Sequence, residues 1–301
     1  MVVLNHNGHD LLRDCLESLE SQSLTDFETI VVDNGSTDGS CEMVKEKFPL
    51  VRVLPLGENF GFSIANNAAI RNALERRSKY VLLLNNDTTV ASDFIAEMVR
   101  AIDSDERIGA VCPKIFFADP SDLLWYAGGD FSMWTANPRH RGWKQRDTGQ
   151  FDEQCDVTLA TGCALLVRSS ALRDVGLLDE QFWAYLEDVE WSVRFLKKNY
   201  RLVFAPKARV WHRDGATWVR SIGAGSAVKR QFLSSRNMLF LAWKHARPLQ
   251  LPFYLAGFLF HHVLFYSALR IIRKDYRAFW AVYRGIAAGV GGTSRDKNWI
   301  S

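Results

Sequence analysis

An apolar run that ends in three polar residues is the feature that most constrains the fold of this chain. Residues 80–84 read Tyr-Val-Leu-Leu-Leu, and Asn85, Asn86 and Asp87 follow directly. A short apolar run without polar alternation predicts a strand that is covered on both faces, as in the centre of a parallel sheet. Ligands of open α/β sheets bind beyond the carboxyl ends of such strands. We therefore expect Asn85 to Asp87 at a functional edge of a central sheet.

The first hundred residues alternate between strand-like and helix-like patterns. This alternation predicts an α/β fold, with a mostly parallel central sheet flanked by helices. The expected strands cover residues 2–4, 28–32, 51–54 and 80–84, and the expected helices cover residues 10–20, 41–48 and 64–76. Residues 119–156 keep no sustained period and are rich in tryptophan and charge, which indicates a long functional loop or an edge hairpin over a site.

The last part of the chain has a different character. A helix is expected at 186–198 and short strands at 202–205 and 209–211, after which three helical stretches follow, at 229–247, 249–272 and 275–289. We therefore divide the chain into a domain at residues 1–228 and a C-terminal helical appendage at residues 229–301. The appendage is basic, and we expect it to associate with a membrane or with another copy of the chain.

The charge of the chain is distributed very unevenly. Residues 1–190 hold 17 basic and 31 acidic side chains, whereas residues 191–301 hold 20 basic and three acidic ones, which together give the net charge of +3. This split predicts a basic face that meets an anionic partner, unless the two halves neutralise each other across an internal interface. Phospholipid, a lipid-linked phosphate and nucleic acid are the candidate partners.

The five cysteines form no C-x-x-C pair, and their number is odd. They are typical of reduced thiols in a reducing compartment and not of a disulfide framework or a zinc site. The opening residues already have the pattern of a strand, so we expect no signal peptide.

Residues 249–269 contain no Lys, Arg, Asp or Glu. The segment is long enough to span a bilayer, but it contains Pro252, His261 and His262, and basic residues flank it. Three interpretations stay open: a helix in the headgroup region of a membrane, a helix packed against protein, and a true span.

Polar residues follow each of the predicted N-terminal strands. Asn5 and His6 follow the first, Asp33 follows the second, and Asn59 lies shortly after the third. These residues would line one cleft, because the carboxyl ends of parallel strands share an edge. Asp33 can accept hydrogen bonds from a nucleobase imide or a ribose hydroxyl, or it can cap the helix that follows. Gly61, which opens the next helix, would allow a ligand to approach the backbone.

Glu187 and Asp188 lie at the start of the helix predicted at 186–198. Carboxylates in the first turn of a helix are favoured by its dipole, so a structural role is one interpretation. The other is general base catalysis, since a carboxylate within hydrogen-bonding reach can take the proton of an attacking hydroxyl.

The ordered motifs resemble those of the family 2 glycosyltransferases of the GT-A fold, in particular the bacterial rhamnosyltransferase-like branch. The resemblance covers about residues 1–215. The motifs that carry it are Val2-Val-Leu-Asn-His-Asn7, Val31-Val-Asp33-Asn-Gly-Ser-Thr-Asp-Gly-Ser40, Glu58-Asn-Phe-Gly-Phe62, Leu82-Leu-Leu-Asn85-Asn-Asp87, Thr161-Gly-Cys-Ala-Leu-Leu-Val-Arg168 and Phe182-Trp-Ala-Tyr-Leu-Glu187-Asp188-Val-Glu-Trp191. The resemblance implies a nucleotide-diphospho-sugar donor, a divalent cation and an inverting single displacement.

The resemblance also implies roles for individual residues. The nucleotide would be bound by Asn5, His6, Asp33, Asn59, Gly61, Phe62 and Asn86. Asp87 is the final acid of the family's D-x-D signature, in which Asn85 replaces the first acid, and His212 matches a histidine that completes the metal shell in relatives. Mg²⁺ or Mn²⁺ is the expected metal. Because the residues alone do not decide it, His212 has an alternative role as a packing histidine.

The resemblance places the catalytic base at Asp188, with Glu187 contacting the acceptor or positioning the loop. Four basic residues around His212 could in addition neutralise the departing nucleoside diphosphate, or they could form a solvated face. They are Lys207, Arg209, Arg213 and Arg220.

The expected function is transfer of a sugar, rhamnose from dTDP-rhamnose, to a glycan or lipid-linked glycan in cell-surface polysaccharide synthesis. The enzyme would act in the cytoplasm at the inner face of the cell membrane. A UDP-hexose donor and a non-catalytic nucleotide-sugar-binding subunit are the alternatives. We expect no nucleic-acid partner, since the basic half lacks the aromatic-basic interleaving of a known module.

Overall fold

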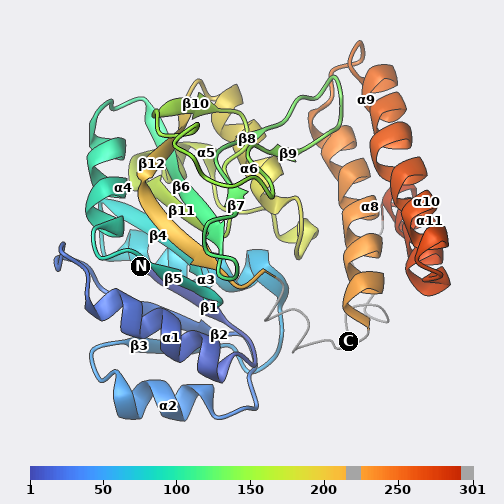
Figure 1. Cartoon of the computed structure of the whole chain (residues 1–301). Helices are drawn as coiled ribbons and strands as arrows, with labels where there is room; N and C mark the ends of the chain where they lie inside the picture. The colour runs from blue at the N-terminus through green and yellow to red at the C-terminus, as the bar shows by residue number, and fades with distance from the viewer. Residues whose placement is uncertain (215–224, 293–301) are drawn as a thin grey trace.

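The polar strand ends predicted from the sequence lie at one edge of a central sheet. The structure, a computed structural model, describes residues 1–214 and 225–292 (Figure 1). The strands on the main path of the sheet are β1 (Val2–Asn5), β2 (Ile30–Asp33), β3 (Arg52–Pro55), β4 (Tyr80–Asn85), β6 (Ile108–Phe117), β10 (Cys155–Val157), β11 (Ala164–Arg168) and β12 (Arg201–His212). Their order is β10-β12-β6-β11-β4-β1-β2-β3.

The sheet is mixed, with most strands in one direction. β3, β2, β1 and β4 pair in parallel, as do β6 and β12. β11 runs antiparallel to both β4 and β6, and β10 runs antiparallel to β12. The expected α/β fold is therefore confirmed, and β11 is the strand that interrupts its parallel order. β5 (Thr88–Val90) pairs with β12 beside this path.

Four helices lie where the sequence predicts them: α1 (His9–Glu20), α2 (Ser40–Lys47), α3 (Gly61–Glu75) and α6 (Glu187–Lys197). The structure adds α4 (Phe94–Asp103), α5 (Ser169–Val175) and η1 (Glu180–Phe182), which the sequence analysis does not predict. The short strands expected at 202–205 and 209–211 form the single strand β12, with an irregularity between Ala205 and Arg209. Such an irregularity lets one strand change its pairing without ending.

The long segment 119–156 is largely a covering layer held by short strands. β7 (Leu124–Tyr126) pairs with β6, and β8 (Gly129–Asp130) pairs with β9 (Arg139–His140). Lys114 of β6 holds the segment to the sheet. Its buried ammonium contacts the carboxylates of Asp147 and Asp152 at 2.9 and 2.5 Å. Two charge-assisted hydrogen bonds compensate the burial of this cation.

The C-terminal helices stand together at one side of the sheet (Figure 1). They are α8 (Ser226–His245), α9 (Leu251–Gly257), the π-helical turn η3 (Phe258–Leu264), α10 (Phe265–Ile272) and α11 (Tyr276–Val290). On α11, a Cβ at Gly285 would lie 2.3 Å from the carbonyl oxygen of Phe232. A Cβ at Gly289 would lie 2.9 Å from the Leu239 side chain. The two glycines therefore allow α11 to approach α8 more closely than larger residues would.

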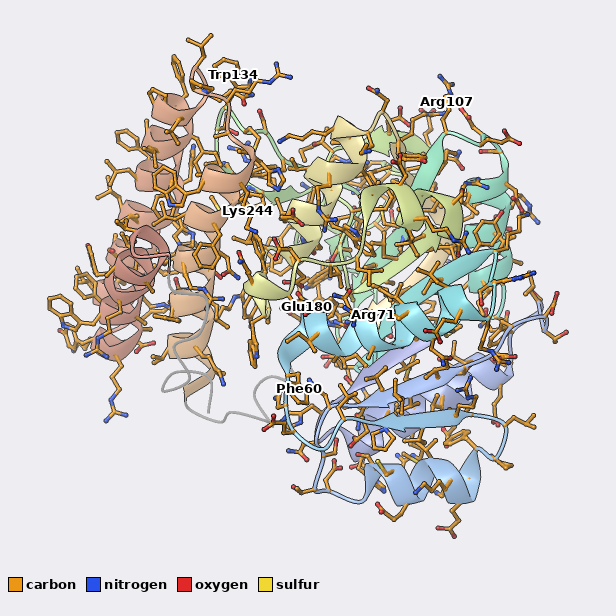
Figure 2. All side chains as sticks on the ribbon, turned by 180° about the vertical axis from the view of Figure 1, so that it is seen from behind. Phe60, Arg71, Arg107, Trp134, Glu180 and Lys244 are labelled. Atoms are coloured by element: carbon orange, nitrogen blue, oxygen red, sulfur yellow. The ribbon has the colours of Figure 1, made fainter. Side chains whose placement is uncertain are left out.

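These helices also pack tightly against the rest of the molecule. A Cβ at Gly257 would lie 2.0 Å from the carbonyl oxygen of Thr135, and Trp134 contacts Phe253. Lys244 pairs with Asp179 at 2.6 Å. Seen from behind, Lys244 lies on the side of α8 that is turned toward the sheet domain (Figure 2). Arg71 and Glu180, which pair at 2.8 Å, are labelled next to one another on the sheet domain. The boundary that we propose at residue 228 falls within the first turn of α8, so a cut there would break this helix.

Many basic side chains of the C-terminal part pair with acids of the N-terminal part. The pairs are Lys198–Asp174, Arg201–Asp105, Arg201–Asp156, Arg213–Asp14 and Lys244–Asp179. Internal neutralisation therefore accounts for part of the charge asymmetry. Further cations remain on the last helices, at Arg270, Arg273, Lys274 and Arg277, where Asp275 is the nearby acid.

Candidate active site

A cavity of about 480 Å³ opens beyond the carboxyl ends of β1, β2 and β4. It reaches from these strand ends to α8 and η3. Nine of the residues singled out from the sequence line it: His6, Asn59, Gly61, Phe62, Asn86, Asp87, Glu187, Asp188 and His212. Asp87 and Asp188, about a hundred residues apart in sequence, thus line the same cavity. Its size suits a ligand of about the size of a nucleotide sugar.

Asn5 and Asp33 do not line this cavity. Asn5 is fully buried, accepts a hydrogen bond from Asn86 at 2.6 Å and donates to Asp33 at 3.4 Å. Asp33 also accepts a hydrogen bond from the backbone N–H of Ser36 at 3.1 Å. The two residues tie the ends of β1, β2 and β4 together and so fix where Asn86 and the following Asp87 lie.

The side of the cavity near His6 is built around Asn34 and Asn59. Asn34 donates to the Asn59 side chain at 3.0 Å and accepts from the N–H of Phe60 at 2.9 Å. Gly61 follows with φ +82°, and a Cβ there would lie 2.6 Å from the Trp183 ring. Glycine is required at this position by its conformation and by its neighbour. Asn34 lines the cavity beside the predicted residues.

Asp87 and His212 form a buried pair on the cavity wall. His212 Nε2 lies 3.2 Å from Asp87 Oδ1, because β12 brings His212 opposite Thr88 of β5. Burial disfavours the imidazolium, but Cys163 and Asp87 outweigh it and raise the pKa of His212 well above 6.5. Burial raises the pKa of the Cys163 thiol, so the thiol stays neutral and Asp87 is the anion that stabilises the imidazolium.

The pair fits a divalent cation only in part. Within residues 1–214 and 225–292 no cluster of three His, Cys, Asp or Glu side chains could hold a metal ion. Asp87 and His212 nevertheless offer one oxygen and one nitrogen that face the cavity. Such a set suits Mg²⁺ or Mn²⁺ when a ligand supplies further oxygens.

Glu187 and Asp188 begin helix α6 on another wall of the cavity. Burial and then the neighbouring Asp188 raise the pKa of Glu187 well above its ordinary value of 4.5. Burial also raises the pKa of Asp188, but backbone N–H groups of Gly162 and Val189 donate to its carboxylate at 3.0 and 2.8 Å and oppose the rise. Between the two, Asp188 is the better holder of the negative charge.

A strained turn sets the position of these acids. Trp183, Tyr185 and Leu186 all have positive φ, at 59°, 68° and 67°. Such conformations are unfavourable for residues with side chains and persist only where neighbours enforce them. Here the backbone of α3 takes part, because the N–H of Phe62 donates to the Trp183 carbonyl at 2.6 Å.

Helix α8 holds the same turn from the other side. The amide of Asn237 donates to the carbonyls of Phe182, Ala184 and Tyr185 at 2.7–2.9 Å. Arg236 donates to the Phe182 carbonyl at 3.1 Å, and its guanidinium lies over the Phe240 ring. Both side chains are 0% exposed. We call Arg236 and Asn237 the clamp, because they hold this turn through hydrogen bonds. The clamp cannot be predicted from the sequence, since an Arg-Asn pair inside a helical pattern gives no sign of what it contacts.

The basic residues expected around the leaving group lie elsewhere. Lys207, Arg209 and Arg213 do not line the cavity, and Arg213 pairs with Asp14 at 2.9 Å. Arg220 lies outside the described residues. Arg230 of α8 lines the cavity instead, over the Tyr185 ring. Among the described residues, the Arg or Lys side chain that lines the cavity is thus Arg230 and not Lys207, Arg209 or Arg213.

Comparison with known proteins now decides the family. Residues 1–176 match the family model described as glycosyl transferase family 2, which covers more than half of the chain.

The chain belongs to glycosyl transferase family 2.

Two of its relatives are similar over most of their length. The N-acetylglucosaminyl-diphospho-decaprenol L-rhamnosyltransferase of Mycobacterium tuberculosis is 27% identical over 82% of this chain and 84% of the relative. The dTDP-rhamnosyl transferase RfbF of Shigella flexneri is 23% identical over 87% of each chain. The rhamnosyltransferase-like resemblance is thereby confirmed.

Solved structures confirm the GT-A arrangement. A mannosyltransferase from Pyrobaculum calidifontis, in complex with GDP-Man and Mn²⁺, covers 97% of this chain and 86% of its own, with a TM-score of 0.59 and 14% identity. GalNAc-T7 with UDP, GalNAc and Mn²⁺ covers 70% of this chain, with a TM-score of 0.57 and 19% identity. The glycosyltransferase described here spans 42% of that longer chain.

Replacing Glu187 with glutamine tests the electrostatics of the acid pair. The pKa of this carboxyl is higher in the folded chain, so the unfolded chain binds fewer protons between the two values, and stability falls as the pH rises through them. The Glu187→Gln variant lacks this fall. We expect the free energy of unfolding of the variant to exceed that of wild type by on the order of 1 kcal/mol at pH 8 and to approach it near pH 4.5. Urea unfolding at a series of pH values measures this difference.

Glu180→Gln is the matched control. Hydrogen bonds from Asn67 and Arg71 lower the pKa of Glu180, so its substitution should have the opposite pH trend and lose stability above pH 4.5. Parallel pH curves for wild type and Glu187→Gln would contradict the assignment of a high pKa to Glu187.

Proposed function

We propose that this glycosyltransferase moves rhamnose from dTDP-rhamnose to a lipid-linked glycan, with inversion at the sugar carbon. The observation that carries the proposal is that Asp87 and Asp188 line a single cavity at the strand ends. Both relatives are named for rhamnose transfer, which supports the sugar. The Shigella flexneri relative is named for a dTDP-linked donor and the Mycobacterium tuberculosis relative for a lipid-linked acceptor.

Asp188 would act as the general base. As the acceptor hydroxyl oxygen attacks C1 of rhamnose, its proton passes to the Asp188 carboxylate and the bond from C1 to the phosphate oxygen breaks. The products are the rhamnosyl acceptor, dTDP and the protonated acid. Attack from the face opposite the departing phosphate inverts C1. The Gly162 and Val189 N–H bonds support this role, because they orient the carboxylate and favour its ionised form against the effect of burial.

Asp87 and His212 would hold Mg²⁺ or Mn²⁺, and the imidazolium of His212 would release its proton when the cation binds. The cation would neutralise charge that develops on the departing diphosphate. Since Asn85 replaces one acid of the family's signature, Asp87 is the carboxylate on which this binding would depend. Arg230, which lines the same cavity, would add positive charge beside the phosphates without any metal. The nucleoside would lie between His6, Asn59 and Phe62, with Asn34 closing that end.

Asp188→Asn tests the proposed reaction. The amide has the shape of the carboxylate but cannot take a proton at neutral pH, so rhamnose transfer should fall at least a hundredfold while dTDP binding is retained. Transfer is followed with radiolabelled dTDP-rhamnose, and UDP-glucose and UDP-galactose serve as donor controls. Wild-type rates in the variant would exclude the base assignment, and transfer from a UDP-hexose alone would replace the donor. A wild-type chain that binds dTDP but transfers from none of these donors would favour a non-catalytic binding subunit.

Asp87→Asn tests the metal assignment through binding and not through turnover. A ligand specific for the folded state raises the melting temperature. In wild type, Mn²⁺ should enlarge the shift that dTDP produces, and the substitution should remove that enlargement while leaving the dTDP shift without metal unchanged. An equal effect of Mn²⁺ on both proteins would show that Asp87 does not hold the ion.

We propose in addition that the last helices contact the inner face of the cell membrane. The helix at Leu251–Ile272 is long and apolar enough to cross a membrane by length and composition. The exposed large apolar side chains of α9 to α11, here called the exposed apolar face, are Phe253, Leu259, Phe260, Leu264, Phe265, Ile271, Ile272, Tyr276, Trp280, Tyr283 and Val290. Arg270, Arg273, Lys274 and Arg277 accompany it. Aromatic residues with basic neighbours suit a headgroup region with anionic lipid.

Vesicle sedimentation tests this contact. A double substitution of Phe260 and Phe265 by serine removes two exposed rings, 64% and 59% accessible, and should weaken binding to vesicles with 30% anionic lipid at least tenfold. Leu50→Ser is the control, because Leu50 is 94% exposed at the end of α2, outside these helices. Equal sedimentation of the double variant and the control would refute the membrane contact.

A further inference from the structure

Three C-terminal elements line the cavity with side chains that the mechanism above does not use. α8 contributes Gln231 and Ser234, η3 contributes His262, and α10 contributes Tyr266. We call these four residues the C-terminal wall. All of them lie beyond residue 176, where the family match ends. The cavity thus has one side built by the strand ends and another built by helices outside the matched region.

Two buried polar atoms on this side have no partner. Gln231 Oε1 and Glu187 Oε2 make no hydrogen bond among the described residues, although their side chains are only 3% and 6% exposed. A buried polar atom without a partner is costly, and folded proteins rarely keep one unless a ligand or an ordered water completes it. Both residues line the cavity, so a ligand there can complete them.

The chemistry of these atoms selects the class of ligand. An amide oxygen only accepts hydrogen bonds, so its ligand must donate one. A phosphate oxygen only accepts and cannot pair with Gln231 Oε1. A sugar hydroxyl both donates and accepts, and it can therefore pair with Gln231 Oε1 and with Glu187 in either protonation state. Met238 and Leu186 lie on the same cavity surface, where they can contact the C–H groups of a sugar ring.

The π-helical turn fixes the rest of the wall. His262 lies within η3, stacks on Phe258 at 5.3 Å, contacts Tyr266 at 5.0 Å and hydrogen-bonds the Ser235 hydroxyl at 3.0 Å. A π-helical turn inside a longer helix shifts the side chains that follow it, and such turns are frequent at functional sites. The ring is therefore held rigidly at the cavity by contacts on three sides.

We propose that the C-terminal wall and Glu187 form the subsite for the acceptor sugar, with Gln231 Oε1 accepting a hydrogen bond from one of its hydroxyls. The inference rests on the proposed function and adds the residues that recognise the acceptor. Helix Leu251–Ile272, which presents His262 and Tyr266 to the cavity, also carries much of the exposed apolar face. The same helix would then hold the lipid of the acceptor on one side and its sugar on the other.

Gln231→Leu and Gln231→Glu test the subsite with N-acetylglucosaminyl-diphospho-lipid and rhamnosyl-diphospho-lipid acceptors of short chain length. Leucine removes the oxygen, so the acceptor KM should rise about tenfold while the KM for dTDP-rhamnose stays unchanged. Glutamate keeps an accepting oxygen and should restore much of the acceptor affinity. Gln250→Leu, on the turn before α9 and outside the cavity, is the control and should leave both KM values unchanged.

Deoxy analogues of the acceptor identify the hydroxyl and guard against a folding defect. Wild type should bind one deoxy analogue about tenfold more weakly than the full acceptor, whereas Gln231→Leu should bind that analogue and the full acceptor equally well. For each of the other analogues, the loss of affinity relative to the full acceptor should be the same in both proteins. Melting temperatures check that the leucine variant is folded, and if it is not, the comparison is made with Gln231→Met, which also removes the oxygen.

The two hypotheses fail in different ways. If wild type transfers rhamnose and Gln231→Leu has the same acceptor KM as wild type, the subsite is wrong and the proposed function stands. If wild type transfers no sugar to either acceptor, the proposed function is wrong and the subsite inference falls with it.

Discussion

The contact between Arg236-Asn237 of α8 and the turn before Glu187 is the interaction on which the rest of the site depends. The carbonyls of Phe182, Ala184 and Tyr185 all accept from one buried amide, and three residues of the turn adopt positive φ. Without donors from α8, these buried carbonyls would be left unsatisfied, and the turn would relax to a more extended form. The placement of the acid pair is therefore a property of the sheet domain and the last helices together.

Much of the fold follows from sequence patterns that are local. The apolar run before Asn85, the alternation of strands and helices, and the change to helices after residue 229 all predict elements that the structure contains. Patterns of this kind succeed because each strand or helix must bury one face or both, and this requirement is visible within a few residues. The direction of β11 was not visible in this way, since strand direction depends on which neighbours a strand finds.

The candidate site likewise contains residues that local patterns predict and residues that depend on tertiary packing. Residues at strand ends, such as His6 and Asp87, could be predicted because parallel strands deliver their ends to one edge. Asn5 and Asp33 obey the same rule but are used to join strands. Arg230, Gln231 and His262 could not be predicted, because their position depends on how α8 and η3 pack against a turn fifty residues earlier in the chain. The requirement for glycine at positions 285 and 289 could not be predicted for the same reason, because it arises only when α11 packs against α8.

The position of the clamp restricts how acceptor preference can change in this scaffold. One helix, α8, carries Gln231 and Ser234 on the cavity wall and, one turn later, Arg236 and Asn237 at the turn before the acid pair. Exchanging the C-terminal helices between homologues would replace both sets at once. A chimaera could retain the position of the acid pair only if the incoming helix carried the arginine and the asparagine at the same positions relative to its cavity-lining residues. Recombination that changes acceptor preference in this fold must therefore preserve the spacing of one helical turn between the two sets.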